Sequence, residues 1–289
     1  MPVTPADSEE QALNMFTHNG WTVEAVTSAI SSDKDMDTIK TQLDVMSLPE
    51  QLFGDNSLQL TNEAYGVQLS FSALPALAAW HQEALPPVQV ASAQQWSQSR
   101  EQDIAAHKPL RFNYDWTFTS PFQGTLRRPS SSSDPSDASK GMLCWTETTQ
   151  RIDKGMLMAR DPILYYAEVP LYVSELDDNG VSQITVKVRV MPKCWFALLR
   201  FWLRIDHTLV RLRETRYFCN TSLPDEEACI IRETTYRDGT FEELGAAGAP
   251  PEGPAYADAD STAAALQAAA PIGLKLLQIE RLAFGKLNG

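Results

Sequence analysis

The sequence is poor in cysteine and contains no long apolar run. Its 289 residues include 4 cysteines, none of them in a C-x-x-C pair of the kind that binds zinc or carries thioredoxin chemistry. Arginine or proline interrupts each strongly apolar stretch well before the ~18 residues of a membrane-spanning helix. The first ten residues, MPVTPADSEE, lack a basic flank followed by an apolar segment. We therefore expect no membrane span and no signal peptide, reduced thiols, and a cytoplasmic location, with the nucleus left open.

Motifs of the common enzyme classes are absent as well. The sequence has no G-x-x-x-x-G-K-[ST] phosphate loop, no G-x-G-x-x-G, no G-x-S-x-G and no H-E-x-x-H. The four histidines are scattered along the chain. An aspartate within an aromatic segment, Asp115 beside Trp116, leaves open a hydrolase or transferase that uses it with His207 or His107, although such a carboxylate more often pairs with an arginine. The absences favour a non-catalytic protein without cofactor or metal.

Positive charge is scarce overall but concentrated in one segment. The formal net charge is -13, from 24 lysines and arginines against 37 acidic residues. Between Lys187 and Arg216, eight basic residues stand against two acidic ones, a balance of +6 that leaves -19 for the rest of the chain. A nucleic-acid binder needs a net basic face, so this class is disfavoured. A basic stripe in an acidic chain indicates an acidic protein partner, and solvated strand faces are the alternative.

Composition divides the chain into one domain and several plain segments. Residues 1–19 are polar, acidic and without periodicity, which predicts a mobile tail before a single domain at 20–289. Residues 127–141, RRPSSSSDPSDASKG, form a low-complexity stretch that predicts an exposed loop insertion. Residues 245–270 are rich in alanine, glycine and proline, and predict a linker or a plain surface segment.

Alternating apolar and polar residues predict an antiparallel sheet. In residues 169–192, Asp-Asp-Asn-Gly separates two segments of strand character, which predicts a hairpin. The alternation continues through 199–206 and 209–213, and it predicts that the arginines there lie on the wet face of two paired strands. A helix starting at Pro192 stays open as the alternative. Helices are predicted at 33–45, near Pro75, and over the amphipathic 271–287, so the fold class is a single α+β domain.

Three long stretches resemble one family. They are MSLPEQLFGDNSLQL at 46–60, YDWTFTSPFQGTL at 114–126, and the segment from LDDNG to RETRYF at 176–218. In this order they are similar to the Tap-forty-two-interacting proteins, the TIP-forty-one-like or TIPRL family. The resemblance extends loosely from Gly20 to Phe284.

The resemblance implies a non-catalytic regulator that binds catalytic subunits of type 2A-like serine/threonine phosphatases and acts in TOR signalling. It also implies a curved antiparallel sheet with flanking helices, and the Tap-forty-two or alpha-four type of protein as a further partner. The family engages a short, acidic phosphatase tail that ends in apolar residues, and arginine donors beside an apolar pocket suit such a tail. A general signalling scaffold is the remaining alternative.

Site residues carried over by the resemblance come from the matching motifs. Ile152 lies in RIDK, and Leu212 and Glu214 lie in VRLRETR, where the family has an interaction-sensitive segment. Asp115 and Trp116 are expected to frame the site. The electrostatic candidates are Arg200, Arg204, Arg211, Arg213 and Arg216.

Overall fold

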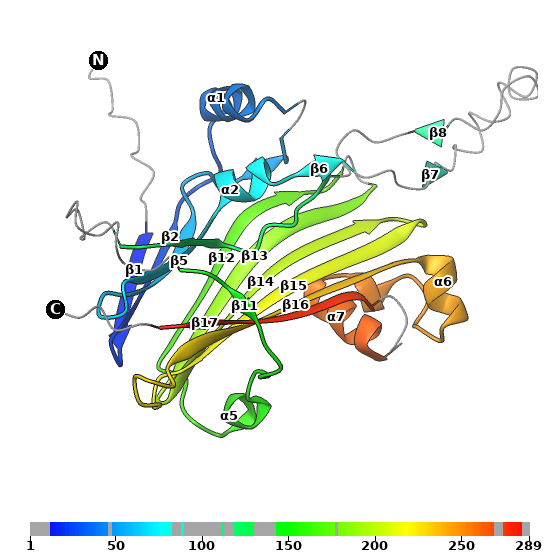
Figure 1. Cartoon of the computed structure of the whole chain (residues 1–289). Coiled ribbons are helices and arrows are strands. Elements are labelled where there is room, and N and C mark those ends of the chain that lie inside the picture. Colours follow the sequence, from blue (N-terminus) through cyan, green and yellow to red (C-terminus); the bar gives the residue numbers. More distant parts are fainter. Residues whose placement is uncertain are drawn as a thin grey trace, which may run out of the picture.

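The chain folds into two antiparallel sheets with short helices at their surfaces (Figure 1). The computed structural model describes residues 12–45, 48–82, 88–89, 111–112, 118–129, 143–176, 179–268 and 274–284. One sheet has eight strands and the other five. Two minor pairs join β6 (His81–Gln82) to β9 (Phe118–Thr119) and β7 (Val88–Gln89) to β8 (Arg111–Phe112). The predicted α+β class is confirmed.

The larger sheet has the strand order β11-β17-β16-β15-β14-β13-β12-β3. Strands β12 to β16 are neighbours in sequence as well as in space, as expected for antiparallel hairpins. Residues 194–205 form a strand rather than the alternative helix, and every one of them pairs with both neighbouring strands. The strands are β3 (Gln51–Leu52), β11 (Thr146–Glu147), β12 (Tyr165–Ser174), β13 (Gly180–Met191), β14 (Cys194–Ile205), β15 (Leu209–Asn220), β16 (Cys229–Thr240) and β17 (Leu274–Ala283).

The smaller sheet packs against one face of the larger sheet, which we call the inner face. The largest apolar cluster joins residues of both sheets, with Trp21 edge-on to Trp195 at 5.0 Å and Phe71 edge-on to Tyr217 at 5.5 Å between ring centroids. Such aromatic pairs add to the burial of apolar area. The strands, in sheet order, are β1 (Ala12–His18), β2 (Trp21–Thr27), β4 (Ser57–Asn62), β5 (Val67–Ser72) and β10 (Thr125–Arg127).

Helices lie on both sides of the larger sheet. We call the face of the larger sheet opposite the inner face the outer face. One smaller apolar cluster holds α5 against it, and a second cluster holds α6, η2 and α7 against another part of it. Ser32 caps α1, as its position in the sequence predicts. No helix within the described residues is long and apolar enough to cross a membrane. The helices are α1 (Asp33–Leu43), α2 (Ala73–Ala78), α5 (Lys154–Met158), α6 (Phe241–Ala246), the 3-10 helix η2 (Pro254–Tyr256) and α7 (Ala259–Ala268).

The predicted C-terminal helix is wrong, because residues 274–283 form strand β17. β17 pairs with β16 along its length, from Leu274 opposite Arg237 to Ala283 opposite Cys229. Its apolar side chains serve two cores: Leu282 joins the large inner cluster, whereas Ile279 packs against the α5 cluster on the outer face. A strand with apolar side chains on both faces can match a helical spacing of apolar residues by chance, and tertiary pairing decides the outcome.

Two expectations about plain segments are also corrected. Residues 12–18, expected in the N-terminal tail, form strand β1 in full register with β2. The region 245–270, expected as a linker, contains η2 and α7, and α7 is held by Ala265 and Leu266 in an apolar cluster. Residues 1–11 and 130–142, which include most of the expected tail and loop insertion, lie outside the described residues.

Candidate functional site

The five candidate arginines lie on two opposite faces of the sheet, so the prediction of one shared wet face is wrong. The register of β14 and β15 sets Arg200 directly opposite Glu214 and places both on the outer face. Residues on either side of Glu214 then turn the other way, so Arg213 and Arg211 lie on the inner face with Tyr217. Arg200, Arg204 and Arg216 lie on the outer face.

The two inner arginines are enclosed within the protein. Arg211 is buried, and its Nε donates to Asp238 Oδ2 at 2.9 Å while a second nitrogen donates to Thr119 Oγ1. The guanidinium of Arg213 stacks over the Tyr236 ring at 4.3 Å, and its Nη2 lies 3.9 Å from the same Asp238 oxygen. Both arginines therefore have Asp238 as an anion within the protein, as buried cations require.

On the outer face, Glu214 is buried between two guanidinium groups. Its Oε1 accepts from Nε and Nη2 of Arg200, at 3.0 and 2.7 Å, and its Oε2 accepts from Arg216. Arg200 is itself buried and donates through Nη1 to Asp260 on α7. Glu214 therefore orients both arginines and neutralises part of their charge.

Glu233 continues this network toward α5. It lies opposite Arg216 in the register, and its Oε1 accepts from Arg151 Nε at 2.7 Å and from the backbone N of Ile152 at 2.9 Å. Burial opposes ionisation of Glu233, but these hydrogen bonds and the charge of Arg216 outweigh burial and lower its pKa below the ordinary value. Glu233 is therefore a stable anion at neutral pH.

Lys187 continues the network in the other direction. Its Nζ lies 3.2 Å from Asp260 Oδ2 and 3.2 Å from Glu168 Oε1. The result is a row of alternating charges that crosses the outer face from β12 to the loop before α5. We call it the charge ladder; its members, in order, are Glu168, Lys187, Asp260, Arg200, Glu214, Arg216, Glu233 and Arg151.

Apolar clusters border the charge ladder on both sides. Ile152 is buried in the α5 cluster, and Leu212 is buried with Trp202 in the α7 cluster. The structure therefore brings Ile152, Leu212 and Glu214 to one face, as supports of that face rather than as exposed contacts. The ladder members reachable from solvent include Arg151 and Arg216, whose side chains are 50% and 30% exposed.

The strands of the outer face carry more basic than acidic side chains, whereas the segment 241–268 that covers part of them has five acidic residues and no basic one. In strands β12 to β17 the register places three acidic side chains there, all of them in the charge ladder. Of the basic ones, Lys187, Arg200 and Arg216 also belong to the ladder. The other basic residues that the register places on the outer face are Arg189, Arg204, Arg237 and Arg281. The basic side chains that outnumber the acidic ones on these strands can pair with acidic groups of a partner.

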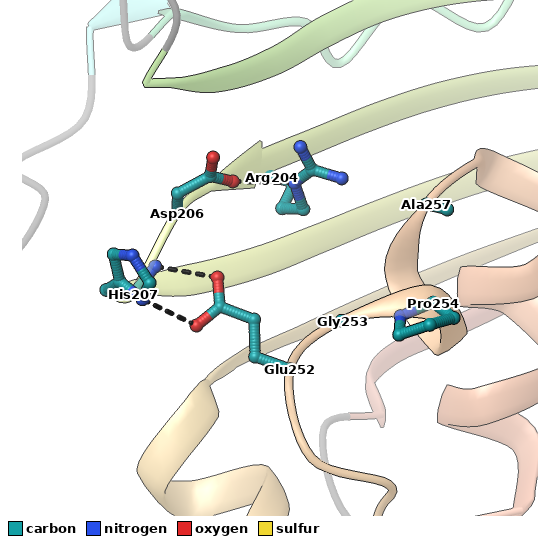
Figure 2. A pocket seen from close by; sticks show the side chains of 7 residues that line it. All are labelled: Arg204, Asp206, His207, Glu252, Gly253, Pro254 and Ala257. Atoms are coloured by element: carbon teal, nitrogen blue, oxygen red, sulfur yellow. Dashed lines mark hydrogen bonds and ion pairs between the residues drawn. The ribbon is translucent and has the colours of Figure 1, made fainter.

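Two shallow hollows adjoin Arg204 at the end of β14. One, of about 470 Å³, is bordered by Arg204, His207 and Glu252 (Figure 2), and the other, of about 490 Å³, by Trp202, Arg204 and Asp258. Arg204 donates to Asp206 Oδ1 at 2.7 Å and to the Tyr256 carbonyl at 2.8 Å. The bond to Tyr256 ties the end of β14 to η2.

Of the alternative catalytic site, His207 alone lies within the described residues. His207 sits at the turn after β14, where its backbone N and Nδ1 lie 2.8 and 3.0 Å from the carboxylate oxygens of Glu252 (Figure 2). Asp115, Trp116 and His107 lie outside the described residues. Among the residues that the structure does describe, no group of three or more histidine, cysteine or acidic side chains is arranged to hold a metal ion.

Sequence reasoning missed several members of the charge ladder. Glu233 is visible in the sequence as an acidic residue inside the strand ACIIRETTYRD, but the alternation there does not predict which basic residue it binds. Asp260 gave no signal, because it lies in the alanine-rich region that resembled a linker. Arg151 depends on a loop that only the folded chain brings beside β16.

Comparison with known proteins agrees with the resemblance. A model of the TIP41-like family matches residues 51–245. A TIP41-like protein of Arabidopsis thaliana is 40% identical over 248 residues, which cover 83% of each chain. A TIP41-like protein of Homo sapiens is 34% identical over 79% of this chain and 78% of its own. The type 2A phosphatase activator TIP41 of Saccharomyces cerevisiae is 29% identical over 78% of this chain and 63% of its own. The chain therefore belongs to the TIP41-like family.

Proposed function

We propose that this protein is a non-catalytic regulator that binds the catalytic subunit of type 2A-like serine/threonine phosphatases through the outer face of its larger sheet. Two relatives, from Saccharomyces cerevisiae and Schizosaccharomyces pombe, are named type 2A phosphatase activators. The observation that carries the proposal is the excess of arginine on the outer face of a chain whose net charge is -13. Arginines on these strands favour the binding of an acidic segment here.

The outer face exposes both cations and an apolar side chain, which suits an acidic phosphatase tail that ends in apolar residues. Arg216 and Lys187 are partly exposed cations that can bind carboxylates while Glu214 and Glu168 hold them in place. Leu277 on β17 is 42% exposed and lies opposite Thr235, on the same face, where it offers an apolar contact. A binding role in TOR signalling, with a Tap-forty-two or alpha-four type of protein as a further partner, extends this proposal.

Capture of the phosphatase with and without its tail tests the proposal. The immobilised full chain is incubated with a purified type 2A catalytic subunit, and in parallel with the same subunit truncated before its C-terminal tail. We expect retention of the intact subunit and at least about tenfold weaker retention of the truncated one, because a charged contact at a specific interface contributes this much. Equal retention of both overturns the role of the tail, and no retention of either overturns the phosphatase partner.

A further inference from the structure

Helix α7 covers part of the outer face with small side chains. Its buried residues are Ala259, Thr262, Ala265 and Leu266, so Leu266 is its one large apolar contact with the sheet. Beneath it lie Trp202, Val210 and Leu212. The helix also lies beyond residues 51–245, the part matched by the family model. Because the side chains of α7 are small, the helix buries less apolar area than larger side chains could bury against the same part of the sheet.

The cover also fits imperfectly. Thr262 Oγ1 and Trp202 Nε1 are buried with no hydrogen-bond partner among the described residues, and their side chains are 0% and 3% exposed. A buried polar group without a partner destabilises the packing around it. The hollow of about 490 Å³ lies at the same place, between Trp202 on the sheet and Asp258 just before the helix.

Asp260 binds the sheet as a ligand from solvent would. Its side chain is 69% exposed, whereas those of its partners Arg200 and Lys187 are 7% and 25% exposed. Hydrogen bonding to Arg200 lowers the pKa of Asp260 below its ordinary value, so the carboxylate is charged at neutral pH. Lifting α7 away would leave Arg200 and Arg216 with Glu214 as their shared anion, and would leave Lys187 with Glu168. The position beside Arg200 and Lys187 that Asp260 would leave therefore favours another carboxylate.

We propose that α7 occupies a docking site for a partner segment that carries a carboxylate near a large apolar side chain, with Asp260 and Leu266 standing in for these two groups. Leu266 follows Asp260 by six positions, which is a rise of about 9 Å along a helix. An extended segment covers the same distance in about three residues. The occupant we infer is therefore an extended acidic segment whose apolar side chain follows its carboxylate by about three positions. This inference rests on the proposed function, because the acidic tail of the phosphatase is such a segment.

Two variants change the cover in opposite directions. Asp260→Asn removes the ionic contact of α7 with Arg200 and Lys187, and we expect an acidic, apolar-ended tail peptide to bind about 2- to 5-fold more tightly, the range set by one partly exposed ion pair. Thr262→Val keeps the shape but removes the unpartnered hydroxyl, so we expect the peptide to bind about 5-fold more weakly. Asp37→Asn on α1, an exposed residue with the same charge change, is the matched control and should not alter binding.

Hydrogen exchange separates displacement of α7 from simple contact with it. Saturating peptide should raise the exchange of amides in residues 259–268. Unchanged or slower exchange there, or weaker peptide binding by Asp260→Asn, overturns the covered site. Capture of the whole catalytic subunit keeps the two proposals distinct. Equal capture by the wild type and both variants overturns the covered site alone, and capture by none of them overturns the proposed function as well.

Discussion

Arg200 on β14 binds one carboxylate oxygen of Glu214 on β15 through two guanidinium nitrogens, at 3.0 and 2.7 Å, with both side chains buried. The other carboxylate oxygen accepts from Arg216. This single acid thereby joins an enclosed cation to one that reaches solvent. The relationship explains how a sheet face can carry several arginines and still fold.

Glu214→Gln should therefore destabilise the fold. Loss of the carboxylate charge leaves Arg200 buried with Asp260 as its remaining anion, and breaking a buried pair of this kind costs about 3 kcal/mol. Urea denaturation followed by tryptophan fluorescence measures the change. A double variant, Arg200→Met with Glu214→Leu, should lose less stability than the single one, since it buries no unpaired charge. A single variant as stable as the wild type contradicts the pairing.

The stability of the protein should depend on pH through Glu233. Its pKa in the folded state lies below the ordinary value of 4.5, so its contribution is complete above pH 4.5 and is lost as pH falls through the lower folded value. Glu233→Gln should be less stable than the wild type by about 1–3 kcal/mol at pH 7. The difference in free energy of unfolding between the two proteins should shrink below pH 4.5, as Glu233 of the wild type takes up a proton. Denaturation curves across this pH range provide the check, and a difference that does not change with pH would rule out the assignment.

Gly180 should not tolerate a side chain. Its φ is +148°, and an added Cβ would lie 2.0 Å from the carbonyl oxygen of Arg204 at the start of the β13–β14 pair. We expect Gly180→Ala to destabilise the protein by about 2 kcal/mol or more. Gly245→Ala in α6 is the comparison, because a Cβ there meets nothing within 4 Å and alanine favours a helix by about 1 kcal/mol. Thermal unfolding of the two variants should shift in opposite directions.

Alternation along the chain predicted the central strands but not which face each arginine takes. The hairpin from β12 to β13 and the strand character of residues 194–205 followed from local pattern and turn chemistry. The face of Arg211 depends on which residue of β14 it opposes, and that register is decided by the folded hairpin. A shift of this register by one residue would move Arg211 from the enclosed inner face to the outer face.

Long-range pairing explains what the sequence could not predict about the site. Arg151 meets Glu233 across 82 residues, and Arg200 meets Asp260 across 60. Neither pair has a local pattern, because each partner looks like an ordinary polar residue in its own segment. The helical spacing of Ile279 and Leu282 misled for the same reason, since each contacts a different apolar cluster.

Binding of a purified type 2A catalytic subunit to the wild type, Arg216→Gln and Lys40→Gln shows whether the outer face holds the phosphatase. Arg216 is a partly exposed cation on the outer face, whereas Lys40 is an exposed cation on α1. We expect about 5-fold weaker binding by Arg216→Gln at low salt, with a reduced salt dependence, and unchanged binding by Lys40→Gln. Wild-type affinity in Arg216→Gln, or an equal loss in both variants, would contradict the proposal that the outer face holds the phosphatase.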